Sequence, residues 1–201
     1  EEGALISGDA TGISLSDSDI TGGISNNGSI EEDNAATISG GINGISLSNG
    51  SNIMGAEGGD AIYNSGVIDG DTGNGIVINA SEVSSGLGSY AINNIGEITG
   101  GTNGISLVEA GSLGGEGSSG DLTNSGLISG GSNGLSLSSS SIYGGVTNSG
   151  DIIGTTDDGI TLGGEGGSTI SGSITNESTG LISGGNVGIE LLSASTVSGG
   201  I

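Results

Sequence analysis

Carboxylates are the only ionised side chains that this chain offers for chemistry, because its 201 residues include 23 Asp and Glu but no Lys, Arg, His or Cys. Carboxylate and carbonyl oxygens in flexible loops are the ligands that Ca²⁺ prefers. Residues 55–62 nearly match a calcium-binding Gly-rich nonapeptide, and other acids occur close together near turns. The candidate calcium ligands are Glu57, Asp60, Asp69, Asp71, Asp157 and Asp158. The alternative is a solvated acidic surface, and the sequence leaves both open.

The formal charge of −23 and the missing residue types exclude several classes of function. Without Lys or Arg the chain cannot neutralise phosphates, so we expect no nucleic-acid partner. Without His or Cys it can form no Ser-His-Asp or Cys-His catalytic system, no His/Cys zinc site and no disulfide. Apart from calcium, we expect no cofactor.

A repeat of about 30 residues organises the whole chain. Four apolar columns recur with seven members each, and the clearest is Ile6, Ile38, Ile68, Ile98, Ile128, Ile152 and Ile182. The intervals in that column are 32, 30, 30, 30, 24 and 30 residues. Length varies mainly in Gly-rich or Ser-rich gaps such as 54–61, 84–91 and 114–121, which predicts loops that project from one corner of each unit.

Each repeat contains very short strands separated by turns. Segments such as Ile45–Leu47 and Ile105–Leu107 alternate apolar and polar residues, and no stretch keeps a helical period. One short strand cannot bury its apolar face alone, but stacked units can bury a continuous column. The sequence therefore predicts one all-β domain over residues 1–201, a parallel β-solenoid of about seven coils with 24–32 residues per coil. Its apolar runs are only a few residues long, so we expect no membrane insertion of this segment.

Two asparagine columns support the same interpretation. One lies two residues after the apolar column that begins at Ile24, and we predict a structural ladder of Asn26, Asn64, Asn94, Asn124, Asn148 and Asn176. The other precedes a Gly-Ile step and consists of Asn43, Asn74, Asn103 and Asn133. Asn tolerates tight corners, and stacked amides can bond from coil to coil.

Residues 122–137 and 174–191 carry the repeat best, with the pattern Ile-Thr-Asn-Ser-Gly-x-Ile-Ser-Gly-Gly-x-x-Gly-Ile-x-Leu. This pattern resembles passenger-domain repeats of bacterial autotransporters and related surface adhesins, and degenerate copies cover the whole chain. The resemblance implies a right-handed parallel β-helix on the bacterial cell surface. The chain departs from such passengers in its lack of Lys and Arg.

The expected function is that of a non-enzymatic structural protein of the cell surface or extracellular space: an adhesin stalk, a passenger domain or a filament subunit. Paired carboxylates can hydrolyse glycosides, but β-helical enzymes of that kind also use Arg, Lys or His, which this chain lacks. The alternative is a calcium-dependent glycan- or surface-binding module.

The chain starts and stops at matching points of the repeat, since Ile201 falls in an apolar column. A solenoid cut there exposes unpaired strand edges. We therefore expect either a segment of a longer solenoid or a filament subunit, with copies of itself or flanking repeats as end-to-end partners. Host or surface glycans are the alternative partners.

Overall fold

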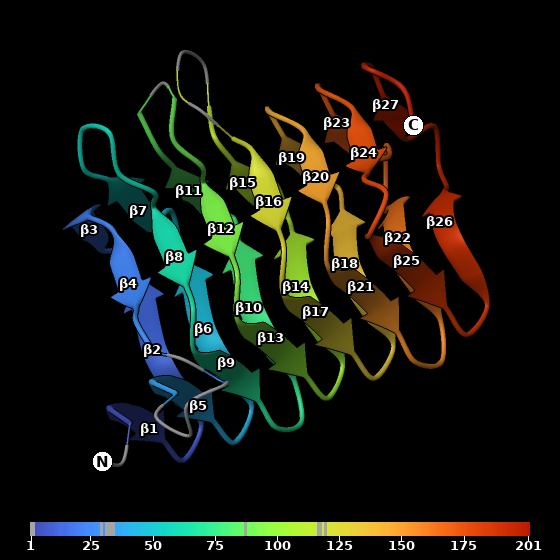
Figure 1. Ribbon diagram of the computed structural model, residues 1–201. Coiled ribbons are helices and arrows are strands. Elements are labelled where there is room, and N and C mark those ends of the chain that lie inside the picture. The colour runs from blue at the N-terminus through green and yellow to red at the C-terminus, as the bar shows by residue number, and fades with distance from the viewer. Residues whose placement is uncertain (1–2, 29, 31–34, 87, 116–117, 119) are drawn as a thin grey trace.

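The computed structural model describes residues 3–28, 30, 35–86, 88–115, 118 and 120–201. They form an all-β parallel solenoid in which short strands follow one another around each coil and the coils stack along one axis (Figure 1). The prediction of a parallel β-solenoid is confirmed. No helix in the described part of the chain is long and apolar enough to cross a membrane.

Four parallel sheets run along the stack: three take one strand from each of the seven coils, and the fourth takes one from each of the first six. Sheet A consists of β1 (Leu5–Gly8), β5 (Thr37–Gly40), β9 (Val67–Gly70), β13 (Glu97–Gly100), β17 (Leu127–Gly130), β21 (Asp151–Gly154) and β25 (Leu181–Gly184). Sheet B consists of β2 (Thr11–Ser16), β6 (Asn43–Ser48), β10 (Asn74–Asn79), β14 (Asn103–Val108), β18 (Asn133–Ser138), β22 (Asp158–Gly163) and β26 (Val187–Leu191).

The other two sheets are built from shorter strands. Sheet C consists of β3 (Asp19–Gly22), β7 (Asn52–Gly55), β11 (Glu82–Ser84), β15 (Ser112–Leu113), β19 (Ser141–Ile142), β23 (Thr169–Ile170) and β27 (Thr196–Val197). Sheet D consists of β4 (Ile24–Asn26), β8 (Ile62–Asn64), β12 (Ile92–Asn94), β16 (Leu122–Asn124), β20 (Val146–Asn148) and β24 (Ile174–Asn176). The described residues thus form six coils of four strands and a seventh coil of three, close to the predicted seven. Ile201 is the last residue and lies in no strand.

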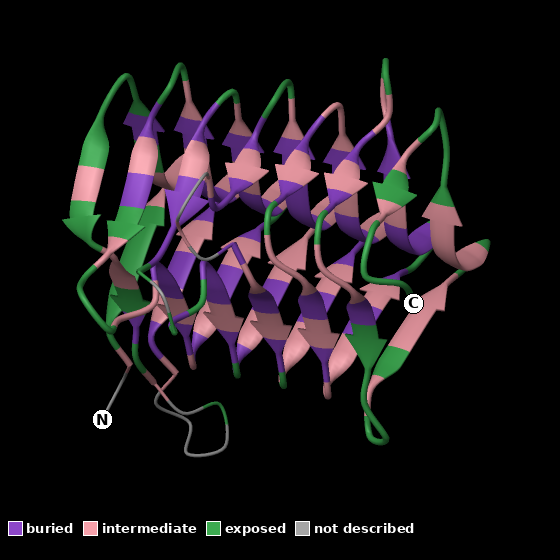
Figure 2. Cartoon of the chain, turned by 90° about the horizontal axis from the view of Figure 1, so that it is seen from above, coloured by how far each residue is buried: buried purple, intermediate pink, exposed green. Residues whose placement is uncertain are grey.

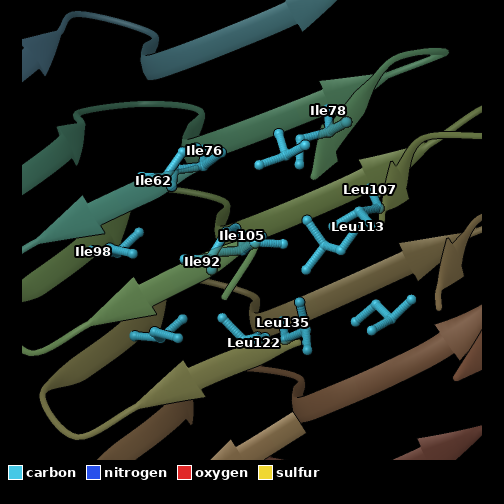
Figure 3. Close-up of a cluster of buried hydrophobic side chains, with 14 of the residues drawn as sticks. Ile62, Ile76, Ile78, Ile92, Ile98, Ile105, Leu107, Leu113, Leu122 and Leu135 are labelled. Atoms are coloured by element: carbon cyan, nitrogen blue, oxygen red, sulfur yellow. The ribbon is translucent and has the colours of Figure 1, made fainter. Parts of the chain in front are cut away.

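Equivalent residues of neighbouring coils pair in register, which stacks apolar side chains on apolar side chains in the core. In sheet B, Ile76 pairs with Ile105 and Ile105 pairs with Leu135. These inward side chains, with those of the other three sheets, fill the space between the sheets (Figure 3). Each fully buried Ile or Leu contributes about 1.5 to 3 kcal/mol, so the repeated column is the main source of stability.

The core is open at both ends of the stack. Ile38 is 2% exposed, whereas Ile6, at the same position in the first coil, is 50% exposed. In the first and last coils Leu15 is still buried, but six residues that pack against the core are only partly buried: Ile13, Ile20, Ile24, Ile182, Ile189 and Val197. Figure 2 shows the same gradient, with buried residues concentrated in the middle of the stack. An end coil has a neighbour on one side only, so part of its apolar face remains uncovered.

Each coil turns from sheet B to sheet C through residues in the left-handed backbone region. At this B–C corner Ala80 has φ 46° and Ser139 has φ 52°, and a glycine, Gly164, takes the same place in the sixth coil with φ 91°. The left-handed conformation raises the free energy of a non-glycine residue by about 1 to 2 kcal/mol. The hydrogen bonds between coils must offset this penalty. Residues of this corner, among them Ala80 and Ser139, also line hollows on the outer surface beside sheet C.

Candidate functional site: side-chain ladders and a carboxyl pair

The six asparagines of the predicted ladder end the six strands of sheet D, where the chain turns towards sheet A. In each pair, the Nδ2 amide donates to the Oδ1 of the next asparagine towards the C-terminus at 2.8 Å. The four central members, from Asn64 to Asn148, are 0% exposed. The ladder is therefore a continuous chain of buried amide hydrogen bonds along the solenoid.

Each inner ladder amide also donates to two backbone carbonyls, one in its own coil and one in the next coil. Asn94 Nδ2 donates to the carbonyl of Gly96 at 3.2 Å in its own coil and to that of Leu127 at 3.0 Å in the next coil. An amide is the side chain that supplies both the acceptor and the donors this position needs. Because buried polar groups must be satisfied, the ladder fixes the register in which neighbouring coils stack.

The second asparagine column forms a shorter ladder at the start of the sheet B strands, and its bonds run in the opposite direction. Asn103 Nδ2 donates to Asn74 Oδ1 at 2.9 Å, and Asn133 Nδ2 donates to Asn103 Oδ1 at 3.0 Å. In the sixth coil the position is taken by Asp158, whose backbone N–H donates to Asn133 Oδ1 at 3.1 Å. A carboxylate cannot continue an amide ladder, so the chain of amide bonds ends at Asn133.

A serine column at the B–C corner forms a third ladder that the sequence interpretation missed. Ser51, Ser81, Ser140 and Ser168 are all buried. Ser140 Oγ donates to the Ser138 carbonyl at 2.8 Å, and the Ser140 N–H donates to Ser168 Oγ at 3.1 Å. The signal was present in the sequence, since a Ser precedes the apolar residue of sheet C by two positions in six of the seven units. Gly111 interrupts the column, because a Cβ there would collide with the Ile78 carbonyl oxygen.

Two of the predicted calcium ligands bond to a neighbouring coil. Asp60 accepts through Oδ1 from the Tyr90 N–H at 2.9 Å and through Oδ2 from Asn93 Nδ2 at 2.8 Å. Asp69 Oδ1 accepts from Thr99 Oγ1 at 2.5 Å. These carboxylates therefore act as acceptors for donors of the next coil.

The other predicted ligands are spread over different parts of the stack. Glu57 is exposed in the loop between β7 and β8, and Asp71 and Asp157 are exposed at turns between sheets A and B, in the third and sixth coils. Asp158 follows Asp157 but is buried. Within the described ranges, no three Asp or Glu side chains come together as a group that could hold a metal ion. Calcium binding at these positions stays a prediction.

Asp158 and Glu190 form a carboxyl pair that the sequence did not indicate. Asp158 is 2% exposed and its Oδ1 has no hydrogen-bond partner. Glu190 lies on the neighbouring strand β26, where it pairs with Thr161. Desolvation raises the pKa of Glu190 above its ordinary value of 4.5, and the charge of Asp158, a hydrogen bond to it and the charge of Asp157 raise it further. Two carboxylates side by side favour the state in which one is protonated.

This pair predicts a pH dependence of stability. Because the folded chain holds the Glu190 proton more tightly than the unfolded chain, the free energy of unfolding falls as pH rises through the raised pKa. Glu190→Gln should therefore raise Tm at neutral pH and lose that advantage in acid below the ordinary Glu pKa. Thermal melts across this pH range check it, with Glu177→Gln, an exposed site with the same charge change, as the control. Equal gains in both variants would mean that net charge alone is responsible.

The stacked sheets and the amide ladder define the chain as a parallel β-solenoid repeat protein. No protein-family model matches it, and no curated protein or solved structure matches it. Its function must therefore be inferred from its own residues.

Proposed function

We propose that the chain is a non-enzymatic structural protein of the cell surface or extracellular space, a rod of coils that is extended at its ends by further coils. The observation that carries this proposal is the open core: most of the apolar columns that are sealed in the middle are only partly covered in the first and last coils. Each end also presents unpaired edges of its strands, which accept further parallel strands.

The chemistry of the side chains supports a structural role. Most buried polar side chains of the described residues bond to the neighbouring coil or to their own backbone, as Asn94 and Ser168 do. A chain without Lys, Arg, His or Cys lacks most of the side chains that enzymes use as bases and nucleophiles. With 23 acids, the outer surface stays highly charged and soluble.

The resemblance of the repeat to passenger domains and surface adhesins supports the extracellular location and the bacterial source. Because the chain has no Lys or Arg, it has no site for trypsin-like proteases, which suits a protein exposed outside the cell. We therefore favour an adhesin stalk, a passenger domain or a filament subunit, in which the adjoining coils come from flanking repeats or from another copy of this chain.

Stacking is tested by light scattering and negative-stain microscopy of the 201-residue chain over a range of concentrations. We expect unbranched particles of uniform width that lengthen with concentration, because end-to-end contacts are heterologous. Ile189→Asp, which places a charge on the open column of the last coil, should shorten them. A chain that stays monomeric at every concentration, with or without this substitution, would contradict stacking between copies of this chain through the open core.

A further inference from the structure

A groove runs along the outer face of sheet C, beside the B–C corner. It is formed by two adjoining hollows of about 300 and 230 Å³ that share Ala110 and Ser112 as lining residues. Its floor takes one outward side chain from each of five successive strands, β7, β11, β15, β19 and β23, which lie side by side in Figure 1. These side chains are Asn52, Glu82, Ser112, Ser141 and Thr169. At about 4.8 Å per strand, the floor is roughly 19 Å long.

Three hydroxyls of this floor are available to a ligand. Ser112 pairs with Ser141, and Ser141 pairs with Thr169, so their side chains repeat once per coil. Among the described residues their hydroxyls have no hydrogen-bond partner, although their backbone N–H groups are bonded to the preceding coil. The adjacent buried Ser140 and Ser168 differ from them, because each of these two hydroxyls donates a hydrogen bond to a backbone carbonyl, that of Ser138 and that of Gly163. The groove therefore offers a periodic row of free donors and acceptors.

The walls of the groove add one aromatic ring and a second carboxylate. Tyr143 is 51% exposed and lines the larger hollow together with Glu165. The backbone carbonyl of Glu165 accepts from Ser139 Oγ at 2.9 Å, which ties its loop to the corner of the preceding coil. An exposed ring presents an apolar face with a polar hydroxyl at its edge, and a carboxylate can accept two hydrogen bonds.

These groups define the class of ligand. A surface with no cation and a net charge of −23 repels polyanions. Among the lining residues only Tyr143 has a large side chain with an apolar face. The apolar area of the groove is therefore too small to bind an acyl chain. Free hydroxyls, carboxylates and one ring face match a neutral sugar, whose hydroxyls donate and accept and whose C–H face packs on aromatic rings. A row of hydroxyls repeated in three successive coils further suits a polymer whose unit is about as long as a pyranose.

We infer that this groove binds a neutral linear glycan that lies along the solenoid axis, with one sugar ring packed on Tyr143. This inference goes beyond the structural role proposed above and does not depend on it, because the groove belongs to the side of the rod and the stacking contacts belong to its ends.

The experiment titrates the full chain with cellohexaose, maltohexaose and N-acetylated chitohexaose, followed by saturation-transfer NMR and calorimetry. We expect at least one of them to bind saturably, with little change between about 50 and about 500 mM salt, because no charge is neutralised. Tyr143→Ala should weaken that binding about tenfold. The matched control is Tyr90→Ala, another exposed tyrosine that does not line the groove, and it should bind as the unchanged chain does.

Hexalysine and hexagalacturonate serve as charged probes in the same titration. Binding of hexalysine alone, lost at high salt, would show an acidic surface without a glycan site and would overturn the inference. Failure of all three neutral hexasaccharides to saturate would overturn it too, as would equal weakening by Tyr143→Ala and Tyr90→Ala. Because Tyr143 is exposed and outside the core, the variant should fold, and an unchanged melting curve verifies this.

Discussion

Replacing Asn94 by aspartate should lower the free energy of unfolding by about 3 to 5 kcal/mol at neutral pH. Asn94 is 0% exposed, accepts from Asn64 Nδ2 and donates to Asn124 Oδ1, both at 2.8 Å. A carboxylate can still accept from Asn64, but it can donate to nothing. Its charge would face Asn124 Oδ1 and the Leu127 carbonyl, which are both acceptors. The substitution thus creates an unpaired buried charge and breaks the ladder.

Urea unfolding measures this cost. Asn27→Asp makes the same chemical change at an exposed asparagine and should change stability by less than about 0.5 kcal/mol. The penalty at Asn94 should also shrink in acid, because a buried carboxyl can be protonated instead of charged. If both variants lose the same stability at neutral pH, the ladder is not holding the coils together.

The second large effect is expected at Gly104, the glycine that precedes Ile105 in strand β14. A Cβ there would lie 2.7 Å from the Gly134 carbonyl oxygen, 2.7 Å from Ile128 Cγ2 and 3.0 Å from the Ser129 nitrogen. Two of these atoms belong to the backbone of the next coil, which cannot withdraw without breaking its own pairing. Gly104→Ala should therefore cost about 3 kcal/mol.

Gly163 supplies the matched control, since it lies in β22 of the same sheet and a Cβ there would meet Leu192 Cβ at 3.6 Å, an ordinary contact. Gly163→Ala should be neutral or stabilise by about 0.5 kcal/mol through the unfolded chain. Thermal unfolding of the two variants side by side decides the matter. Similar Tm values would show that neighbouring coils do not approach as closely at Gly104 as the stacking requires.

Much of the fold follows from the sequence because stacking imposes its period on every column. The apolar residues equivalent to Ile105 and the asparagines equivalent to Asn94 recur at one place in every coil, so their spacing alone predicts the register of the strands. The serine column is equally periodic. Ser is common elsewhere in the chain, however, and its burial depends on the left-handed corner, which no residue type marks.

The carboxyl pair and the groove could not be predicted from one sequence. Asp158 occupies the place of an asparagine in the second ladder, so its burial follows from its column rather than from its own polarity. Glu190 lies near Asp158 only because strands β22 and β26 pair in register. In that pairing Asp158 lies opposite Val187, which is 29 residues later in the sequence. The binding groups of the groove are the outward hydroxyls that form no hydrogen bond within the chain. Which hydroxyls these are follows only from the complete set of contacts between coils.

The most direct test of the stacked register uses cysteine pairs in a chain that has no cysteine of its own. Thr123 pairs with Thr147 on the next strand of sheet D, and Thr147 pairs with Thr175 one coil further. Neighbouring strands lie about 4.8 Å apart, within disulfide reach, whereas two coils span about 9.6 Å, which is beyond it. Under mild oxidation at low protein concentration, we predict an intramolecular disulfide in the Thr123→Cys/Thr147→Cys variant and none in Thr123→Cys/Thr175→Cys. Equal yields from the two variants, measured by mass spectrometry, would contradict the solenoid.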